Sequence, residues 1–173
     1  MNIIIYDDDS KFIEALSTAM LELNVKHNGI FGVPIYLNDI KGVMDYVDKN
    51  KNNQSVFLLD IVTKDESVGY IIARYIKATN PDSIIIYVTD FPEIIIRNMK
   101  ENINALGFVI KTSSDFFEEL EYALLYAHEL LKSEFFISGN GSETFKIKYD
   151  DIFYFEKKKG FNHCQGLREI KYI

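Results

Sequence analysis

The chain has 173 residues, of which 47% are hydrophobic and 26% charged, and its formal net charge is −7. This length fits one domain, or one domain and a fragment, and the apolar content excludes a disordered chain. No apolar stretch approaches the roughly 20 residues needed to cross a bilayer, and the N-terminus lacks the cationic start of a signal peptide. The single cysteine, Cys164, excludes an internal disulfide and a cysteine-rich zinc site. We therefore expect a cytoplasmic protein without a membrane partner.

Charge is unevenly divided along the chain. Residues 1–133 carry 20 acidic and 12 basic side chains, whereas residues 134–173 carry 6 and 7. Attraction to phosphates requires a basic surface, so the acidic body is unsuited to nucleic acid. DNA binding remains open for the C-terminal segment alone.

Two periodicities alternate through residues 1–133. Short, continuous apolar runs, typical of strands covered on both faces, are predicted at 3–6, 31–37, 56–59, 84–88 and 108–110. Apolar residues at helical spacing follow each run, in helices that we expect to begin near Ser10, Asn38, Ile71, Pro92 and Asp115. Five strands alternating with five helices predict an α/β fold with a parallel sheet covered on both faces.

The pattern changes after residue 133. Residues 135–137 and 144–148 flank Gly139-Asn140-Gly141, which predicts a hairpin, and further strands are expected at 152–155 and 167–172. About forty residues are too few for a stable β domain of their own. We expect two parts, a domain over 1–133 and a short β-rich fragment over 134–173.

Polar side chains follow four of the predicted strands, and ligands of an open parallel sheet bind beyond such strand ends. These side chains are Asp7, Asp8, Asp9, Asp60, Thr89 and Lys111. A sheet order of 2-1-3-4-5 would bring them together. Clustered carboxylates repel one another unless a cation lies among them, and Mg²⁺ prefers such oxygen ligands. A lysine and a threonine beside them suit a phosphoryl group, so the predicted ligand is Mg²⁺ with phosphate at Asp60.

These residues, in this order and with Phe108 three residues before Lys111, resemble the receiver domain of bacterial two-component response regulators. The resemblance covers about residues 1–130 and implies a flavodoxin-like (βα)5 fold. It also implies that Asp60 is the phospho-acceptor of a phosphorelay, attacking a phosphohistidine of a sensor histidine kinase. Asp7, Asp8, Asp60 and the backbone carbonyl of Val62 would then bind Mg²⁺.

The same resemblance implies a switch. Lys111 would neutralise the phosphoryl oxygens during transfer, and Thr89 would bind them afterwards. Phe108 would turn inward and reshape the face made by helix four, strand five and helix five, through which the protein could form a homodimer. Such a protein is a signalling regulator that catalyses its own phosphorylation, not an enzyme in the usual sense.

Two departures from the receiver pattern concern loop geometry. Thr112 follows Lys111 where receivers usually have proline, which makes the usual cis peptide bond improbable. The loop from Asp60 to Gly69 is also slightly longer than usual. Asp9 fits a carboxylate in the first turn of a helix better than a third metal ligand.

The C-terminal part is similar to the opening strands of the LytTR DNA-binding domain of AgrA-like regulators. The similarity lies in residues 146–156, and the chain holds only some forty residues of a domain of about 100, as if truncated. The resemblance implies control of transcription. Candidate DNA contacts are Lys157, Lys158, Lys159, His163 and Arg168, for which a solvated basic turn is an equal alternative.

Three rival classes place ligands at the same strand ends. An aspartate-nucleophile phosphatase needs a second acid where Val62 stands. A P-loop NTPase needs a glycine-rich loop with lysine, and a flavodoxin a Ser/Thr/Gly loop, where the chain has three aspartates. The serious alternative is a receiver-like module that takes no phosphate and acts by binding proteins.

Overall fold

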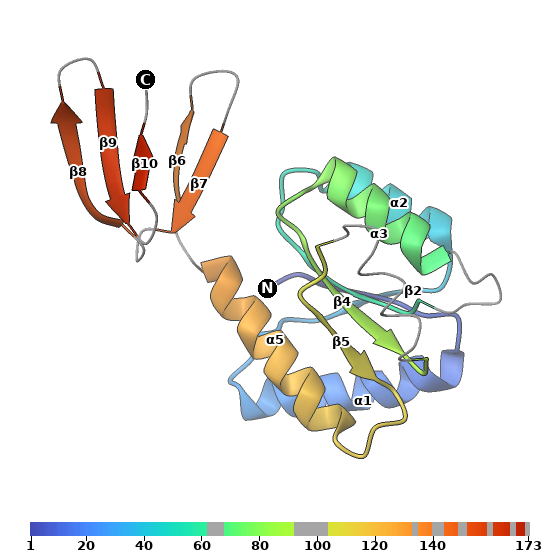
Figure 1. The fold of residues 1–173 in the computed structure, drawn as a ribbon. Helices are drawn as coiled ribbons and strands as arrows, with labels where there is room; N and C mark the ends of the chain where they lie inside the picture. Colours follow the sequence, from blue (N-terminus) through green and yellow to red (C-terminus); the bar gives the residue numbers. More distant parts are fainter. Residues whose placement is uncertain are drawn as a thin grey trace. The chain divides into compact units, whose positions relative to one another are not determined.

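The computed structural model describes residues 1–61, 68–91 and 104–132, together with the backbone of five later strands between 135 and 171 (Figure 1). The chain divides into two compact units, Met1–Leu131 and Lys132–Ile173. The predicted fourth helix from Pro92 and the metal-ligand candidate Val62 lie outside the described residues.

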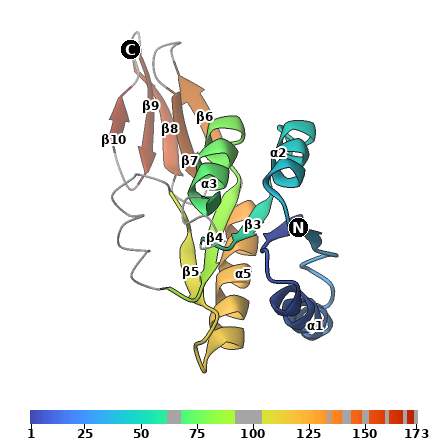
Figure 2. The same cartoon turned by 90° about the vertical axis from the view of Figure 1, so that its right-hand side faces the viewer.

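The first unit contains a five-stranded parallel sheet in the order β2-β1-β3-β4-β5. Its strands are β1 (Ile3–Tyr6), β2 (Ile35–Leu37), β3 (Val56–Leu59), β4 (Ile84–Thr89) and β5 (Gly107–Ile110). Figure 2 shows β3, β4 and β5 following one another across the sheet. The predicted α/β fold and strand order are therefore confirmed.

Helices cover both faces of this sheet. Residues of α1 (Ser10–Lys26) and α5 (Phe116–Lys132) share one core cluster with Ile3 and Ile5. Residues of α2 (Ile40–Lys49) and α3 (Val68–Thr79) share a second cluster with Ile4 and Tyr6. Because successive side chains of a strand point to opposite faces, both sets must be apolar, which explains the continuous apolar runs.

Strand β2 is shorter than the predicted 31–37, because a turn occupies the residues before it. Asn28, Gly29 and Gly32 have φ values of 54°, 78° and 70°, in the left-handed region that favours glycine. The side chain of Asn24 closes this turn, accepting from the N–H of Phe31 at 3.1 Å and donating to the carbonyl of Gly32. Phe31 is consequently a buried core residue and not part of a strand.

Aspartates cap the first two helices, each one residue from the position near which the helix was expected to begin. Asp9, not Ser10, caps α1, and its Oδ1 accepts from the N–H of Lys11 at 2.9 Å. Asp39, not Asn38, caps α2, and its Oδ1 accepts from the N–H of Gly42 at 2.8 Å. All four residue types are good caps, so the sequence alone does not choose between neighbours.

An ion-pair group joins the end of α1 to α5. Glu121 accepts hydrogen bonds from Lys26 Nζ at 2.8 Å and lies 2.5 Å from His27 Nε2. The hydrogen bond from Lys26, followed by that from His27, lowers the pKa of Glu121 below its ordinary value. The ionised form of Glu121 therefore stabilises the folded state.

We expect Glu121→Gln to lower the free energy of unfolding by about 0.2–1 kcal/mol at neutral pH, the range of partly exposed ion pairs. Because the pKa of Glu121 is lowered in the folded state, this contribution to stability is fully present above the ordinary glutamate pKa of 4.5. It is lost as the pH falls through the lower pKa of the folded state. Urea unfolding of both proteins across this range measures the difference. A difference that grows on acidification would contradict the expectation.

The second unit contains two antiparallel sheets, in keeping with the predicted β-rich fragment. The predicted hairpin is present as β6 (Phe135–Gly139) and β7 (Thr144–Lys148), which pair along their length. A second sheet has the order β10-β9-β8, from β8 (Ile152–Lys158), β9 (Phe161–Gly166) and β10 (Glu169–Lys171). None of the described helices combines the length and the hydropathy that a membrane span requires.

Candidate functional site

Three aspartates lie together at the carboxyl edge of the parallel sheet. Asp7 directly follows β1, and Asp60 directly follows β3. Carboxylate oxygens of Asp7, Asp8 and Asp60 all lie within 4.8 Å of one another. Asp7 and Asp60 are only 1% and 5% exposed, whereas Asp8 is exposed to solvent. We call these three residues, together with Lys111, the acid pocket.

Strand register explains why residues so far apart in sequence meet here. Tyr6 of β1 pairs with Leu59 of β3, so the residues that follow them emerge side by side. The N–H of Asp60 donates to the carbonyl of Tyr6 at 2.9 Å, and that of Asp7 donates to Leu37 at 3.3 Å. The backbone of the sheet thus fixes the starting point of both buried carboxylates.

Lys111 directly follows β5 and bridges the two buried aspartates. Its Nζ lies 2.6 Å from Oδ2 of Asp7 and 2.8 Å from Oδ2 of Asp60, and its side chain is 8% exposed. Burial lowers the pKa of Lys111, but hydrogen bonds to Asp60 and Asp7, with their negative charges, outweigh burial and raise it above the ordinary value. Lysine is therefore held as the ammonium ion.

The pKa of Asp7 responds mainly to its burial. Loss of solvation raises this pKa above the ordinary value for aspartate, although hydrogen bonds from Lys111 and from the N–H of Asp9 act in the opposite direction. A buried carboxylate of this kind gains from a cation that compensates for lost water. The acid pocket therefore favours positively charged partners.

Thr89 and Phe108 occupy different environments near the pocket. Thr89, the last residue of β4, is fully buried, and its Oγ1 accepts from the N–H of Phe91 at 3.2 Å. Its carbonyl accepts from the N–H of Lys111 at 2.9 Å, so Thr89 lies next to Lys111 along the edge. Phe108, paired with Tyr87 in the sheet, is 47% exposed.

Asp9 has a structural role that differs from that of its two neighbours. Its side chain caps α1, and its N–H donates to Oδ1 of Asp7 at 2.9 Å. Asp9 is not a member of the carboxylate cluster. These contacts agree with the interpretation of Asp9 as a helix-start residue, and they tie the start of α1 to the acid pocket.

Gly69 packs against the backbone of Asp60, the candidate acceptor. No sequence pattern predicted this contact. A Cβ at this position in α3 would lie 2.5 Å from the carbonyl oxygen of Asp60 and 2.7 Å from Cα of Ile61. Both distances are shorter than real carbon contacts allow, and backbone atoms cannot move aside cheaply. Only glycine lets α3 approach the Asp60 backbone this closely.

We expect Gly69→Ala to destabilise the first unit by about 1–3 kcal/mol, the usual cost of inserting a methyl group into a packed site. The midpoint and slope of urea unfolding give the change. Gly107→Ala is the matched control, because a Cβ there meets nothing within 4 Å. Equal stability of the two variants would contradict the close approach.

Phe12 is a second neighbour of the pocket that the sequence analysis did not identify. Nζ of Lys111 lies over its ring, 4.3 Å from the centroid. Its position in α1 matches the helical spacing of core residues, which gave no signal for a role beside Lys111. The contact is visible only once the fold brings Lys111 next to Phe12.

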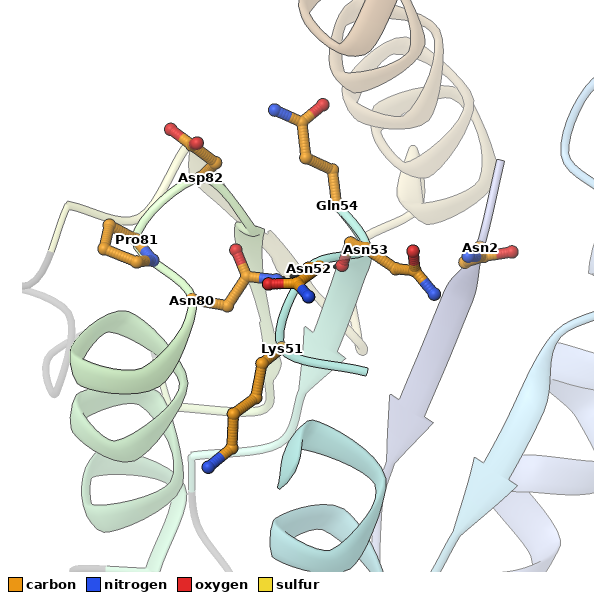
Figure 3. Close-up of a pocket in the computed structure, with 8 residues that line it drawn as sticks. All are labelled: Asn2, Lys51, Asn52, Asn53, Gln54, Asn80, Pro81 and Asp82. Carbon is orange, nitrogen blue, oxygen red and sulfur yellow. Dashed lines mark hydrogen bonds between the residues drawn. The ribbon is translucent and has the colours of Figure 1, made fainter. Parts of the chain in front are cut away.

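A hollow of about 590 Å³ lies at the amino ends of the strands, opposite the carboxyl ends that carry the acid pocket (Figure 3). It is lined by Asn2, Lys51, Asn52, Asn53, Gln54, Asn80, Pro81 and Asp82. These residues precede the strands, whereas the acid pocket follows them. Asn80 inside it already donates to the carbonyl of Asn53 at 2.9 Å, so the hollow is an amide-lined surface separate from the acid pocket.

The candidate DNA contacts fall in the second unit. Lys157 and Lys158 are the last residues of β8, and His163 lies in β9, where it pairs with Glu156. Lys159 and Arg168 lie outside the described residues. The backbone thus places three of the five candidates on two adjacent strands.

No protein-family model and no curated protein sequence matches the chain. Solved structures do match. A response regulator receiver domain from Clostridium thermocellum has a TM-score of 0.61 and 20% identity, covering 76% of this chain and 96% of its own. The signal receiver domain of a two-component response regulator from Bacteroides fragilis has a TM-score of 0.54 and 27% identity, covering 73% and 95%. Chemotaxis protein CheY4 of Vibrio cholerae has a TM-score of 0.57 and 12% identity, covering 73% and 97%.

The chain therefore has the fold of response regulator receiver domains, as the resemblance of residues 1–130 predicted. The matches to these separate receiver domains cover about three quarters of the chain. The LytTR resemblance of the second unit stays a prediction.

Proposed function

We propose that the chain is a phospho-accepting response regulator of a two-component system, with Asp60 as the acceptor. The observation that carries this proposal is the position of Lys111, whose largely buried ammonium contacts the buried carboxylates of both Asp7 and Asp60. A purely structural ion pair needs one acid, whereas Lys111 contacts two carboxylates and a third, that of Asp8, lies within 4.8 Å of both. The excess negative charge would attract a divalent cation, and the charge of that cation would in turn attract a phosphoryl group.

The donor set fits Mg²⁺. Three carboxylates within 4.8 Å of one another supply the hard oxygen ligands that this ion prefers. Asp7, Asp8 and Asp60 would hold it, with the backbone carbonyl of Val62. When bound, Mg²⁺ supplies positive charge that stabilises the phosphoryl oxygens.

The residues of the chain divide the transfer chemistry between them. An oxygen of Asp60 attacks the phosphorus of a phosphohistidine on a sensor histidine kinase, so an O–P bond forms while the N–P bond breaks. The electron pair of that bond stays on the imidazole, which takes a proton from solvent. Lys111 donates to a phosphoryl oxygen during transfer, and the hydroxyl of Thr89 donates to one afterwards.

The output that we propose begins at Phe108. In the phosphorylated state Thr89 turns toward the phosphoryl group, and Phe108 moves from its exposed position into the space left behind. This movement reshapes the face that includes β5 and α5, where a homodimer could form. The second unit, as a LytTR-type fragment, would bind DNA and so regulate transcription. The residues that would contact DNA are Lys157, Lys158, Lys159, His163 and Arg168.

The test of acceptor function is the intact mass after incubation with acetyl phosphate, with and without Mg²⁺. The proposal expects a Mg²⁺-dependent gain of one phosphoryl group. No gain under either condition would instead favour the protein-binding module, with the acid pocket as a metal site alone.

The transcriptional output has a separate test. Binding of the phosphorylated full chain to duplex DNA is titrated at several salt concentrations, because neutralised phosphates make affinity fall with salt. Salt-sensitive binding that weakens when Lys157 and Lys158 are replaced by glutamine supports the output. Its absence at all salt concentrations would remove DNA from the proposal and leave the phosphorylation intact.

A further inference from the structure

Lys111 has an aromatic partner in addition to the two aspartates. Its ammonium carries three N–H donors, and the two carboxylates of Asp7 and Asp60 engage it at 2.6 and 2.8 Å. The ring of Phe12 lies below Nζ at 4.3 Å from the centroid, well inside the range in which an aromatic face attracts a cation. Lys111 is thus enclosed by two anions and one aromatic face.

Phe12 is itself held firmly, which distinguishes it from a chance neighbour. Its ring packs edge-to-face on Phe116, with centroids 5.8 Å apart and an interplanar angle of 76°. Phe116 is 7% exposed and belongs to the core cluster between the sheet, α1 and α5. Phe12 also lies in the first turn of α1, next to the cap residue Asp9, whose N–H donates to Oδ1 of Asp7 at 2.9 Å. The ring is therefore fixed relative to the pocket by a core contact and by a backbone contact.

The chemistry of the proposed reaction needs such a support. Any cation bound by Asp7 competes with Lys111 for that carboxylate, which weakens one of the two contacts that hold the ammonium. An aromatic ring has no charge and no ligand atom for a hard cation, so it attracts the ammonium without competing for metal or phosphoryl oxygens. Phe12 can thus keep Lys111 in place when Asp7 turns to another partner.

We propose that Phe12 is a positioning residue, which holds the ammonium of Lys111 at the acid pocket for phosphoryl transfer. This inference rests on the proposed function of Asp60 as acceptor. Phe12 contacts Lys111 through its ring face and offers no ligand atom, so it would act only through Lys111. Replacing Phe12 should therefore change the rate of phosphoryl transfer and leave the affinity for the phosphodonor unchanged.

The test compares Phe12→Leu with Phe12→Tyr and Phe117→Leu. Leucine keeps an apolar side chain but removes the ring, whereas tyrosine keeps the ring. Phe117 contacts Phe116 at 5.3 Å and is 56% exposed, so Phe117→Leu controls for loss of a phenyl ring from the same aromatic group. Two readouts are measured on the full chain: the kinetics of phosphorylation by acetyl phosphate with Mg²⁺, and the proton shifts of the Lys111 ε-methylene in lysine-labelled protein. Circular dichroism melts confirm that each variant is folded.

We expect Phe12→Leu to lower the maximal rate by about threefold to tenfold, with the half-saturating acetyl phosphate concentration unchanged. The ring-current shift of Lys111 disappears in this variant, and both controls retain the wild-type rate and shift. A wild-type rate or an unaltered Lys111 shift in folded Phe12→Leu would overturn the inference while acceptor function stands. A wild-type protein that takes no phosphate would overturn the proposed function, and the inference with it.

Discussion

Replacing Lys111 with methionine is expected to slow phosphoryl transfer to Asp60 by about 100- to 1000-fold, the usual loss when one fixed electrostatic donor is removed. The ammonium of Lys111 lies 2.8 Å from Asp60 and is almost fully buried, so water cannot replace its charge. Methionine fills a similar volume without a charge. The initial rate of the gain in intact mass, at fixed acetyl phosphate and Mg²⁺, measures the effect.

Lys77→Met is the matched control for this prediction. Lys77 is also partly buried, and burial lowers its pKa, but its Nζ donates to the carbonyls of Ser83 at 2.6 Å and Pro81 at 3.2 Å, away from the acid pocket. We expect Lys77→Met to lose stability and to keep the transfer rate. Equal rates in Lys111→Met and Lys77→Met would contradict the role assigned to Lys111.

Replacing Asp8 with asparagine is expected to weaken Mg²⁺ binding by at least about 10- to 100-fold, a loss that even the groups supporting a metal ligand can cause. Asp8 contributes one of the three clustered carboxylates, and its exposure gives the ion a path from solvent. Isothermal titration of the metal into each variant measures the affinity.

Asp9→Asn provides the control, because the neighbouring acid has a different task. Asparagine caps helices as well as aspartate does, so this change removes a charge and keeps the start of α1. We expect Asp9→Asn to bind Mg²⁺ with nearly unchanged affinity. A loss in Asp9→Asn as large as that in Asp8→Asn would show that net charge, and not ligation, determines the affinity.

Much of the fold follows from periodicity, because each strand of a parallel sheet is apolar on both sides. The runs at 3–6 and 56–59 correspond to β1 and β3 residue for residue. The order of the strands then places Asp7, Asp60 and Lys111 at one edge without any knowledge of side-chain contacts. These parts depend on local sequence and on general rules of chain connection.

Other features depend on tertiary contacts that no local pattern encodes. The strand predicted at 31–37 begins only at Ile35, because the N–H of Phe31 donates to the side chain of Asn24, seven residues earlier. The partner of His27, Glu121, lies 94 residues further along the chain, so no local pattern indicates this contact.

The same reason applies to the two neighbours of the acid pocket. Gly69 gains its meaning from the backbone of Asp60, and Phe12 from the ammonium of Lys111. Phe12 and Lys111 are far apart in the sequence, and Gly69 belongs to the helix after the strand that Asp60 follows. In both cases the residue looks like an ordinary helix position until the elements are packed together.

The most direct test of Asp60 as the acceptor is to locate the phosphoryl group on the chain. After incubation with acetyl phosphate and Mg²⁺, borohydride reduction converts an aspartyl phosphate to homoserine, and peptide mass spectrometry identifies the modified residue. We predict homoserine at position 60 alone, and no modification in Asp60→Asn. Modification at another aspartate in the wild-type chain, or none at all, would contradict Asp60 as the acceptor.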